Sequence, residues 1–397
     1  MEIRQMKPEE RAAYGRLCSL CFTYPYRDES AAVEAETERE QRQYRGAFDE
    51  QGRLCSGMIQ LDMMCHFSGQ EVKMLGIGGV VSHPGHRNCG GIRALFEEGL
   101  PRARQEGYVF SALYPFSHVY YRKFGYELAQ VTREATFNPR DLRADLRRAV
   151  CTELILPEDE AGREAVRQVY EAYARGRNLS VHRDAARWER KWGGTPWEQL
   201  KYLYLFRDAQ NQPMAWWVGE IESNGQRGQL HLLDMAWTKP EGLEAIFAML
   251  RGGNEYKQVR MAVPEDLELR FFLGEPHELQ ERTYCNGMAR VLDVRRALAL
   301  LPAPVLPGNF TVRVSDGQIP ENNGVFRVTG DGIELRVEEA GLDDPDMETD
   351  IGGLTLLVLG KMSLAEAMML NRVRLRRTTP FMEALLIRRP TFLYDSF

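Results

Sequence analysis

The most informative feature of this sequence is a strand-turn-helix pattern. A β-forming run is followed by a glycine-containing turn, which leads into a helical pattern. The run is EVKMLGIGGVVS (Glu71–Ser82), the turn is HPGHRNCGGI (His83–Ile92), and the pattern is RALFEEGLPRARQEG. A basic residue and paired glycines between a strand and a helix are typical of a turn whose backbone N–H groups bind phosphate. The sequence therefore predicts a phosphate-binding turn behind the fourth strand of a mixed sheet.

The chain has 397 residues, which exceeds what one hydrophobic core supports, so about two to four domains are expected. A hydrophobic fraction of 44% with charges along the whole length is typical of a globular protein. No apolar run approaches the roughly 18 to 20 residues of a membrane span, and the polar start does not resemble a secretory signal. We therefore expect a cytoplasmic protein that does not contact a membrane.

The net charge of -6 argues against a nucleic-acid partner, because phosphate backbones are bound by basic faces. The same charge allows cationic substrates. The seven cysteines are scattered, and Cys18 and Cys21 fall within a helical pattern where positions i and i+3 are neighbours on a buried face. Neither the cysteines nor the seven histidines have the spacing of a metal site, so no metal is expected.

Three regions are predicted from the order of the elements. Residues 1–148 read as a short strand at Ile3, a helix over 8–22, strands over 44–50, 54–67 and 71–82, a helix after Gly91, and a strand over 108–116. Pro101 lies inside that second helix and is expected to kink it or end it early. This order predicts an α+β domain with one mixed sheet.

Residues 149–287 repeat a similar order of strands and helices, but TKPEGLEA stands where the first region has its glycine turn. This indicates a second copy of the same fold without the phosphate-binding turn. Residues 288–397 begin with RVLDVRRALALL, are punctuated by prolines, and contain strands FTVRVSD, GVFRVTG and IELRVEE before three short helices. We expect a third domain of different architecture.

The turn resembles the acyl-CoA loop of the GCN5-related N-acetyltransferases (GNAT), whose pattern is Arg/Gln-x-x-Gly-x-Gly/Ala. Arg87 and Gly90 match the first two marked positions, and Ile92 departs from the third. Further along, LYPF (Leu113–Phe116) and VYYRKFGYE (Val119–Glu127) resemble the strand and the Tyr-x-x-Phe-Gly-Tyr segment of the same superfamily.

Over its full length the chain resembles the Eis (enhanced intracellular survival) acetyltransferases. MARVLDV (Met288–Val294) resembles the Met-x-Arg-x-x-Asp-Val pattern that opens the last domain of that family, and the chain ends in an aromatic residue, Phe397. The resemblance implies an α+β fold with two tandem GNAT domains, the second lacking the CoA loop, and a C-terminal sterol-carrier-protein-like α/β domain. It also implies acetyl-CoA as cosubstrate and a homo-oligomer, namely a hexamer.

The resemblance also implies roles for particular residues. Tyr121 is the expected general acid, the terminal carboxylate of Phe397 the expected general base, and the backbone of Val80 polarises the thioester carbonyl. The expected CoA contacts are Val80, Val81, Arg87, Asn88, Gly90, Gly91, Ile92 and Phe116, with His83 and His86 either structural or beside CoA. A base is needed because alkylamines with a pKa near 10.4 are protonated at neutral pH. An α-carboxyl has a pKa of about 3.3 to 3.7, which burial beside aromatic rings would raise.

Alternatives remain open for both catalytic residues. Tyr120 is a second candidate for the acid, Tyr121 can be a core residue, and Phe397 can belong to a frayed chain end. The acceptor wall is predicted at Phe22, Tyr24, Tyr26, Asp28 and Glu29, because aromatic and acidic side chains suit polyamines or aminoglycosides. These aromatics can equally cover a core.

The expected function is acetyl transfer from acetyl-CoA to amines of aminoglycoside-like polycations. One alternative keeps the reaction but takes a protein lysine, a peptide or a small metabolite amine as acceptor. A further alternative is a lipid-binding or scaffold protein that acts through its last domain.

Overall fold

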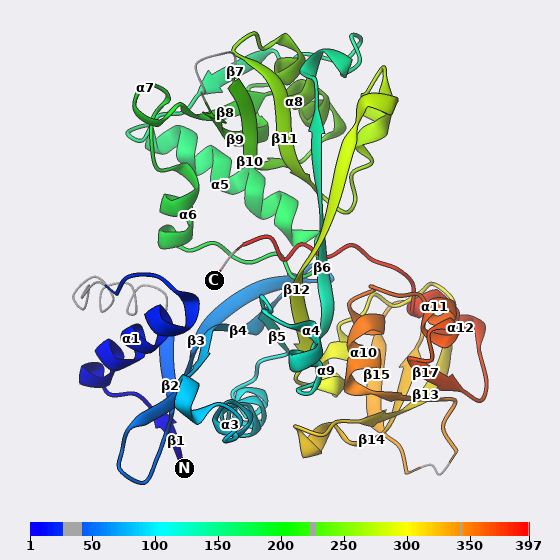
Figure 1. Ribbon diagram of the computed structural model, residues 1–397. Helices are drawn as coiled ribbons and strands as arrows, with labels where there is room; N and C mark the ends of the chain where they lie inside the picture. The colour runs from blue at the N-terminus through cyan, green and yellow to red at the C-terminus, as the bar shows by residue number, and fades with distance from the viewer. Residues whose placement is uncertain (27–41, 223–227, 342–343, 396) are drawn as a thin grey trace. The chain divides into compact units, whose positions relative to one another are not determined.

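The computed structural model describes residues 1–26, 42–222, 228–341, 344–395 and 397 (Figure 1). The chain divides into two compact units. The first contains residues 1–130, 178–181 and 286–397, and the second contains residues 131–177 and 182–285. Among the described helices, none has the length and apolar character to cross a membrane.

The first unit contains the predicted mixed sheet. Its strands are β1 (Glu2–Gln5), β2 (Arg42–Phe48), β3 (Leu54–Phe67), β4 (Gln70–Ser82), β5 (Phe110–Leu113) and the end of β12 (Gln280–Val291), in the order β1-β2-β3-β4-β5-β12. Among the described strands of this sheet, β4 and β5 are the one parallel pair, and the helix between them in the chain is α3 (Gly91–Gln105). A parallel pair joined through a helix brings the turn before that helix to the carboxyl end of β4.

Helices α1 (Arg11–Phe22) and α3 pack on this sheet, and α4 (His118–Arg122) follows β5. Alternate residues of β4 face opposite sides, so Leu75 and Ile77 pack with the apolar stripe of α3 while Met74 belongs to a different cluster. The predicted strand over 108–116 is shorter than expected. The early end expected at Pro101 is wrong, because α3 continues through that residue to Gln105.

The second unit repeats this arrangement. Its strands are β6 (Glu127–Phe137), β7 (Cys151–Leu154), β8 (Lys201–Arg207), β9 (Pro213–Glu222), β10 (Gly228–Trp237) and β11 (Tyr256–Val263), and its helices are α5 (Glu160–Arg175), α6 (Ala185–Trp192), α7 (Pro196–Gln199) and α8 (Pro240–Gly252). The order is β6-β11-β10-β9-β8-β7, with β10 and β11 parallel on either side of α8 in the chain. Lys239 and Pro240 begin α8, so the glycine turn is absent here as predicted.

The last part of the first unit is a separate five-stranded sheet with helices. Its elements are α9 (Val294–Ala299), β13 (Gly308–Ser315), β14 (Gly324–Gly330), β15 (Leu335–Glu339), β16 (Met347–Asp350), α10 (Ile351–Val358), α11 (Leu364–Met369), β17 (Val373–Leu375) and α12 (Pro380–Leu385). The strand order is β15-β14-β13-β16-β17. The short strands β16 and β17 were not predicted, because each has too few residues to show an alternating pattern.

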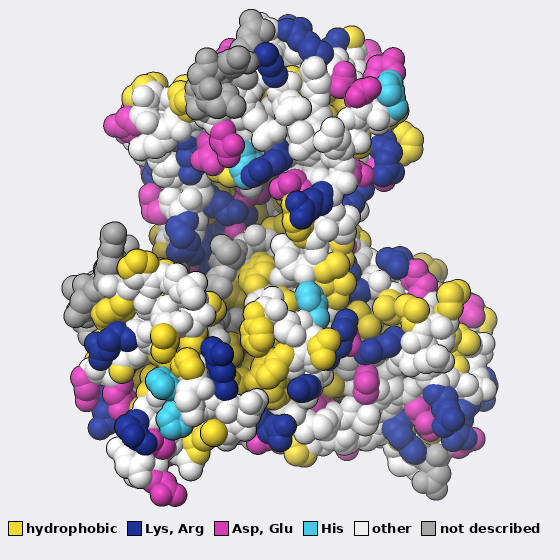
Figure 2. All heavy atoms as spheres, viewed as in Figure 1, with side chains coloured by type: hydrophobic (Ala, Val, Ile, Leu, Met, Phe, Trp, Pro, Cys, Tyr) yellow, Lys and Arg dark blue, Asp and Glu magenta, His cyan; other side chains and the backbone are white. Residues whose placement is uncertain are grey.

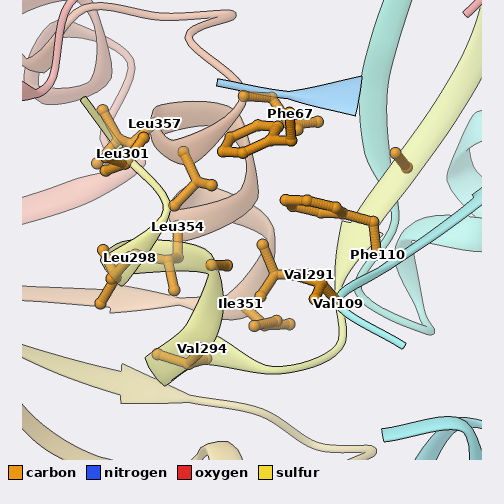
Figure 3. Close-up of a cluster of buried hydrophobic side chains, with 14 of the residues drawn as sticks. Phe67, Val109, Phe110, Val291, Val294, Leu298, Leu301, Ile351, Leu354 and Leu357 are labelled. Carbon is orange, nitrogen blue, oxygen red and sulfur yellow. The ribbon is translucent and has the colours of Figure 1, made fainter. Parts of the chain in front are cut away.

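This last domain shares a hydrophobic core with the first. Figure 3 shows Phe67, Val109 and Phe110 of the first domain facing the cluster of Val294, Leu298, Leu301, Ile351, Leu354 and Leu357 from the last domain, with Val291 beside them. All of these side chains are buried. Burying a side chain of this kind contributes about 1.5–3 kcal/mol, so the cluster fixes the last domain firmly against β3 and β5.

Candidate active site

The pairing of β4 with β5 ends next to a β-bulge in β4. Its parallel pairing with β5 covers Met74–Ile77 only. On the other side Val81 pairs with Gly57 and Gly78 with Ile59, so two residues of β4 oppose one residue of β3. Gly79 at this bulge has φ +56°. A bulge of this kind redirects the backbone and frees its N–H groups beside the gap between β4 and β5.

Val80 and Val81, whose backbone was predicted to contact the thioester, lie at this bulge. The Tyr14 hydroxyl donates a hydrogen bond of 2.5 Å to the carbonyl oxygen of Gly79, which fixes the bulged backbone from the α1 side. Val81 is buried among α1 side chains and Val80 is half-buried against the α3 side. Polarisation of a carbonyl by Val80 stays a prediction.

The turn after β4 forms a concave backbone surface that leads into α3. Asn88 (φ +67°) and Gly90 (φ +84°) both take the left-handed conformation. Ala94 donates the first helical hydrogen bond, to Gly90, which leaves the N–H groups of Gly91, Ile92 and Arg93 without helical partners. These N–H groups sit at the positive end of a 15-residue helix and suit an anionic ligand.

Gly90 and Gly91 of this turn serve different purposes. A Cβ on Gly91 would lie 2.5 Å from the Ser56 Oγ atom, so Gly91 lets α3 approach β3. A Cβ on Gly90 would meet nothing within 4 Å, so the positive φ is what favours glycine there. His83 has a structural role, since its Nδ1 accepts a 3.1 Å hydrogen bond from the Gly85 N–H.

A pocket of about 550 Å³ opens at the start of α3. The turn residues His86, Asn88, Gly90, Gly91 and Ile92 line it, together with Tyr120, Lys123 and Phe124 from around α4, and Gln318 from the last domain. Its positive side chains are Arg93 and Lys123. Arg87 is exposed and lies outside this lining, so its predicted contact with an anionic oxygen stays a prediction.

Tyr121 lies in α4 within a group of aromatic rings. Its ring contacts Phe96, Phe116 and Tyr126 at centroid distances of 6.2, 5.4 and 6.3 Å. The side chain is 2% exposed, and this burial raises the pKa of its phenol well above the usual value. Among the described residues the Tyr121 hydroxyl has no hydrogen-bond partner, so it remains available to a ligand.

Tyr120, the alternative acid, is more exposed. Burial also raises its pKa, while the positive charge of Arg93 opposes that shift. Phe116 is 70% exposed and packs on both tyrosines, so it covers the pair rather than the core. Hydrophobic side chains accordingly gather on the molecular surface around α4 (Figure 2).

The chain end is held against the first domain by a series of hydrogen bonds. Leu393 donates to the Gln130 side chain at 3.0 Å, Thr391 donates to Ala129, and Phe392 donates to Asn178 at 2.8 Å. The Tyr114 hydroxyl contacts the carbonyl oxygens of Leu393 (3.0 Å) and Asp395 (2.9 Å). A chain end fixed at so many points is not a frayed tail.

Phe397 ends this tail on β4. Its ring contacts Tyr114 at a centroid distance of 5.2 Å and lies 3.1 Å from where a Cβ on Gly76 would stand. Its terminal carbonyl carbon and oxygen lie 3.7 and 3.6 Å from the Cβ position of Gly78. The backbone carbonyl group of Phe397 therefore lies where the pairing of β4 with β5 has just ended.

The predicted acceptor wall is only partly described. Phe22 and Tyr24 are 51% and 48% exposed at the end of α1. Tyr26 folds back over α1, with Arg16 over its ring at 5.7 Å. Asp28 and Glu29 lie outside the described residues. Cys18 is buried on the same helix, where burial raises the pKa of its thiol to about 11, in keeping with a core role.

Two groups of described side chains bring metal-ligand atoms within 4.8 Å of one another, namely Asp49 with Cys55 and His86, and Glu220 with Glu222 and His231. Asp49 already accepts hydrogen bonds from the Arg53 backbone and side chain. Neither group has the closed set of four ligands that a structural metal site uses.

Sequence reasoning missed three residues that the fold brings to this region. Tyr114 holds the tail, and it stands within the LYPF segment that was noted only for its resemblance. Lys123 follows Tyr121 by two residues and lines the pocket. Gln318 comes from a loop of the last domain, 226 residues beyond Ile92 in the numbering, so no local pattern could have indicated it.

Comparison with protein families and known proteins agrees with this architecture. Families described as acetyltransferase (GNAT) domain match residues 2–129 and 179–291, and one described as sterol carrier protein domain matches residues 294–392. An "Uncharacterized N-acetyltransferase" of Streptomyces avermitilis is 25% identical over 350 residues, which is 83% of this chain and 81% of that protein.

Solved structures share the whole fold. Eis1 from Mycobacterium abscessus has a TM-score of 0.83 at 19% identity, covering 100% of both chains. A GCN5-related N-acetyltransferase from Anabaena variabilis has a TM-score of 0.83 at 19% identity, covering 98% of this chain and 100% of that one. One from Kribbella flavida has a TM-score of 0.80 at 19% identity over 100% of both chains.

Proposed function

The chain is an Eis-like GCN5-related N-acetyltransferase with two acetyltransferase domains and a C-terminal sterol carrier protein domain, and on this premise we propose that it acetylates amines of aminoglycoside-like polycations. The terminal carboxylate of Phe397 acts as general base and Tyr121 as general acid. The observation that carries this proposal is the position of the Phe397 carboxylate, 3.6–3.7 Å from the Cβ position of Gly78 on β4.

Acetyl-CoA is the cosubstrate of the GNAT fold, and the turn before α3 fits its pyrophosphate. The N–H groups of Gly91 to Arg93, with the left-handed Asn88 and Gly90, would hold the phosphate oxygens. Bound there, acetyl-CoA supplies an activated thioester. Its acyl end would enter the gap between β4 and β5, where the Val80 N–H is proposed to polarise the carbonyl.

The Phe397 carboxylate would accept a proton from the attacking amine. An alkylammonium with a pKa near 10.4 must lose a proton before its nitrogen can attack. A carboxylate held beside the amine both attracts the cation and receives that proton. Tyr114 and the tail hydrogen bonds keep the carboxylate in place, which is the positioning that a base requires.

Tyr121 would donate a hydrogen bond to the departing thiolate. Full transfer of a proton from a phenol of pKa about 10 to a thiolate of about 8.5 costs about 2 kcal/mol, and burial of Tyr121 increases that cost. A strong hydrogen bond from Tyr121 offsets part of that cost, because it stabilises charge that appears only in the transition state before the proton passes to the sulfur. A high pKa also keeps Tyr121 protonated over the whole neutral range.

Aromatic Phe22 and Tyr24 at the end of α1 support a polycationic acceptor, because exposed rings bind cations through their faces. The net charge of -6 supports the same choice through long-range attraction. Lysines of proteins, peptides and small metabolite amines use the same chemistry and are the competing acceptors. Assembly as a hexamer and a cytoplasmic location remain predictions.

The test is an acetyl-transfer assay with an aminoglycoside, a polyamine and a lysine peptide. We compare wild type, Tyr121→Phe and Tyr120→Phe, which are matched removals of one hydroxyl from neighbouring residues. Tyr121→Phe is expected to lower kcat by about 10²-fold or more, while Tyr120→Phe changes it by less than about threefold. Equal effects of the two variants would contradict the assignment of the acid, and transfer confined to the lysine peptide would contradict the assignment of the acceptor.

A further inference from the structure

The pocket at the start of α3 shares lining residues with a second hollow that the proposed chemistry does not use. This hollow, of about 460 Å³, lies between α4 and the last domain, and Lys123 and Gln318 line both spaces. Its other charged lining residues are Arg122, Glu127, Asp316, Asp350 and Arg372. A ligand bound on the turn can therefore extend between Lys123 and Gln318 toward the last domain.

Gln318 carries an unpaired polar atom at this junction. Its side-chain Oε1 atom is buried and has no hydrogen-bond partner among the described residues. Buried polar atoms are nearly always paired, so an unpaired oxygen in a side chain that lines both spaces points to a ligand that supplies the missing donor once the Gln318 amide turns toward it.

The loop that carries Gln318 is rigidly built. The Asp316 carboxylate accepts hydrogen bonds from the backbone N–H groups of Gln318 (2.9 Å) and Ile319 (3.3 Å). It also forms a fully buried ion pair with Arg290 at 2.5 Å, and Arg290 donates in turn to the carbonyl oxygen of Phe124. Gln318 is thereby fixed relative to the turn that bears Lys123 and Phe124.

We propose that Lys123 and Gln318 form the subsite for the 3′-phosphoadenosine end of CoA, so that the last domain takes part in cosubstrate recognition. The inference rests on the proposed function. A Gln amide pairs with adenine through two hydrogen bonds, in which its oxygen accepts from the purine amino group and its nitrogen donates to a ring nitrogen. The Lys123 ammonium supplies a compact positive charge for the 3′-phosphate.

Calorimetric binding of three probes tests this subsite: CoA, 3′-dephospho-CoA and adenosine 3′,5′-bisphosphate. Gln318→Ala is expected to weaken all three by about 5- to 20-fold, because each contains the adenine. Lys123→Ala is expected to weaken CoA and the bisphosphate by about tenfold and to leave 3′-dephospho-CoA within about twofold of wild type. Asn309→Ala, which removes an exposed amide from the same domain, is expected to bind all three probes as wild type does.

Unchanged binding of the bisphosphate by Gln318→Ala would overturn the adenine contact, and equal weakening of CoA and 3′-dephospho-CoA by Lys123→Ala would overturn the phosphate contact. A thermal midpoint equal to that of wild type shows that each variant is folded. A wild-type protein that does not bind CoA would instead contradict the proposed function. Wild-type binding of CoA together with an unaffected Gln318→Ala rejects the subsite and leaves the acetyltransferase intact.

Discussion

The proposed role of the Phe397 carboxylate can be tested directly, because a chain end can be altered without changing any other side chain. One added glycine after Phe397 keeps the aromatic ring, which contacts Tyr114 and lies over Gly76. The new carboxylate then stands one residue further along the chain. A second variant, with the terminal carboxylate converted to a carboxamide by ligation of a synthetic C-terminal peptide, keeps the shape and removes the base.

The size of the effect follows from the geometry. Consecutive Cα atoms are about 3.8 Å apart, whereas a general base acts over a hydrogen bond of about 2.6–3.2 Å. The original carboxyl carbon lies 3.7 Å from the Gly78 Cβ position, so a shift of one residue removes the base from β4. Loss of a positioned general base lowers kcat by about 10²- to 10⁴-fold, equivalent to about 2.7–5.5 kcal/mol of transition-state stabilisation.

The assay measures acetylated product by mass spectrometry, because exposed Cys89 and Cys285 would react with thiol reagents that detect CoA. Phe397→Tyr is the control, since it keeps both the ring and the carboxylate, and it is expected to stay within about threefold of wild type. The affinity for CoA should not change in any of the three variants. Rates within about threefold of wild type for both the glycine extension and the carboxamide would refute the role of the Phe397 carboxylate.

Three further predictions follow from other parts of the structure. Because burial raises the pKa of Tyr121, its acid form persists to alkaline pH, so kcat should not fall between about pH 7 and about pH 9.5; a falling limb in that range that Tyr121→Phe abolishes would contradict this. Gly76→Ala should lower kcat by about tenfold or more without changing CoA affinity, since its Cβ would stand 2.6 Å from the Met63 Sδ atom and 3.1 Å from the Phe397 ring; an unchanged kcat would show that the ring position does not matter. Arg290→Met should destabilise the protein by about 3–5 kcal/mol in denaturant unfolding, because it leaves Asp316 buried and unpaired, and a loss below about 1 kcal/mol would show that the pair is not buried in solution.

Much of the fold was predictable because its elements carry strong local patterns. The strands β3 and β4 match the ranges predicted from their sequence pattern within one residue. The missing glycine turn before α8 also indicated correctly that the second domain repeats the fold without the phosphate-binding turn. The early end that was one of the two outcomes expected at Pro101 does not occur, because a proline costs one helical hydrogen bond and the packing of α3 on β2, β3 and β4 offsets that loss.

Some catalytic candidates could be predicted from local sequence motifs, and others could not. Tyr121 and the turn residues stand in short motifs, so the resemblance to the GNAT family indicated them as candidates. The sequence could not indicate which polar atoms form hydrogen bonds between residues far apart in the chain, such as Tyr114 with the C-terminal residues or Asp316 with Arg290. Such contacts depend on how whole domains pack, and no local periodicity encodes them.

Local patterns of residue types predicted the strand and helix on either side of the glycine turn before α3, and a second copy of this fold without that turn. The packing of the domains places Phe397 on β4, leaves Arg87 exposed and outside the pocket, and brings Gln318 of the last domain to that pocket. The physical reason is the shared hydrophobic core of the first and last domains, whose burial brings residues separated by hundreds of positions into contact.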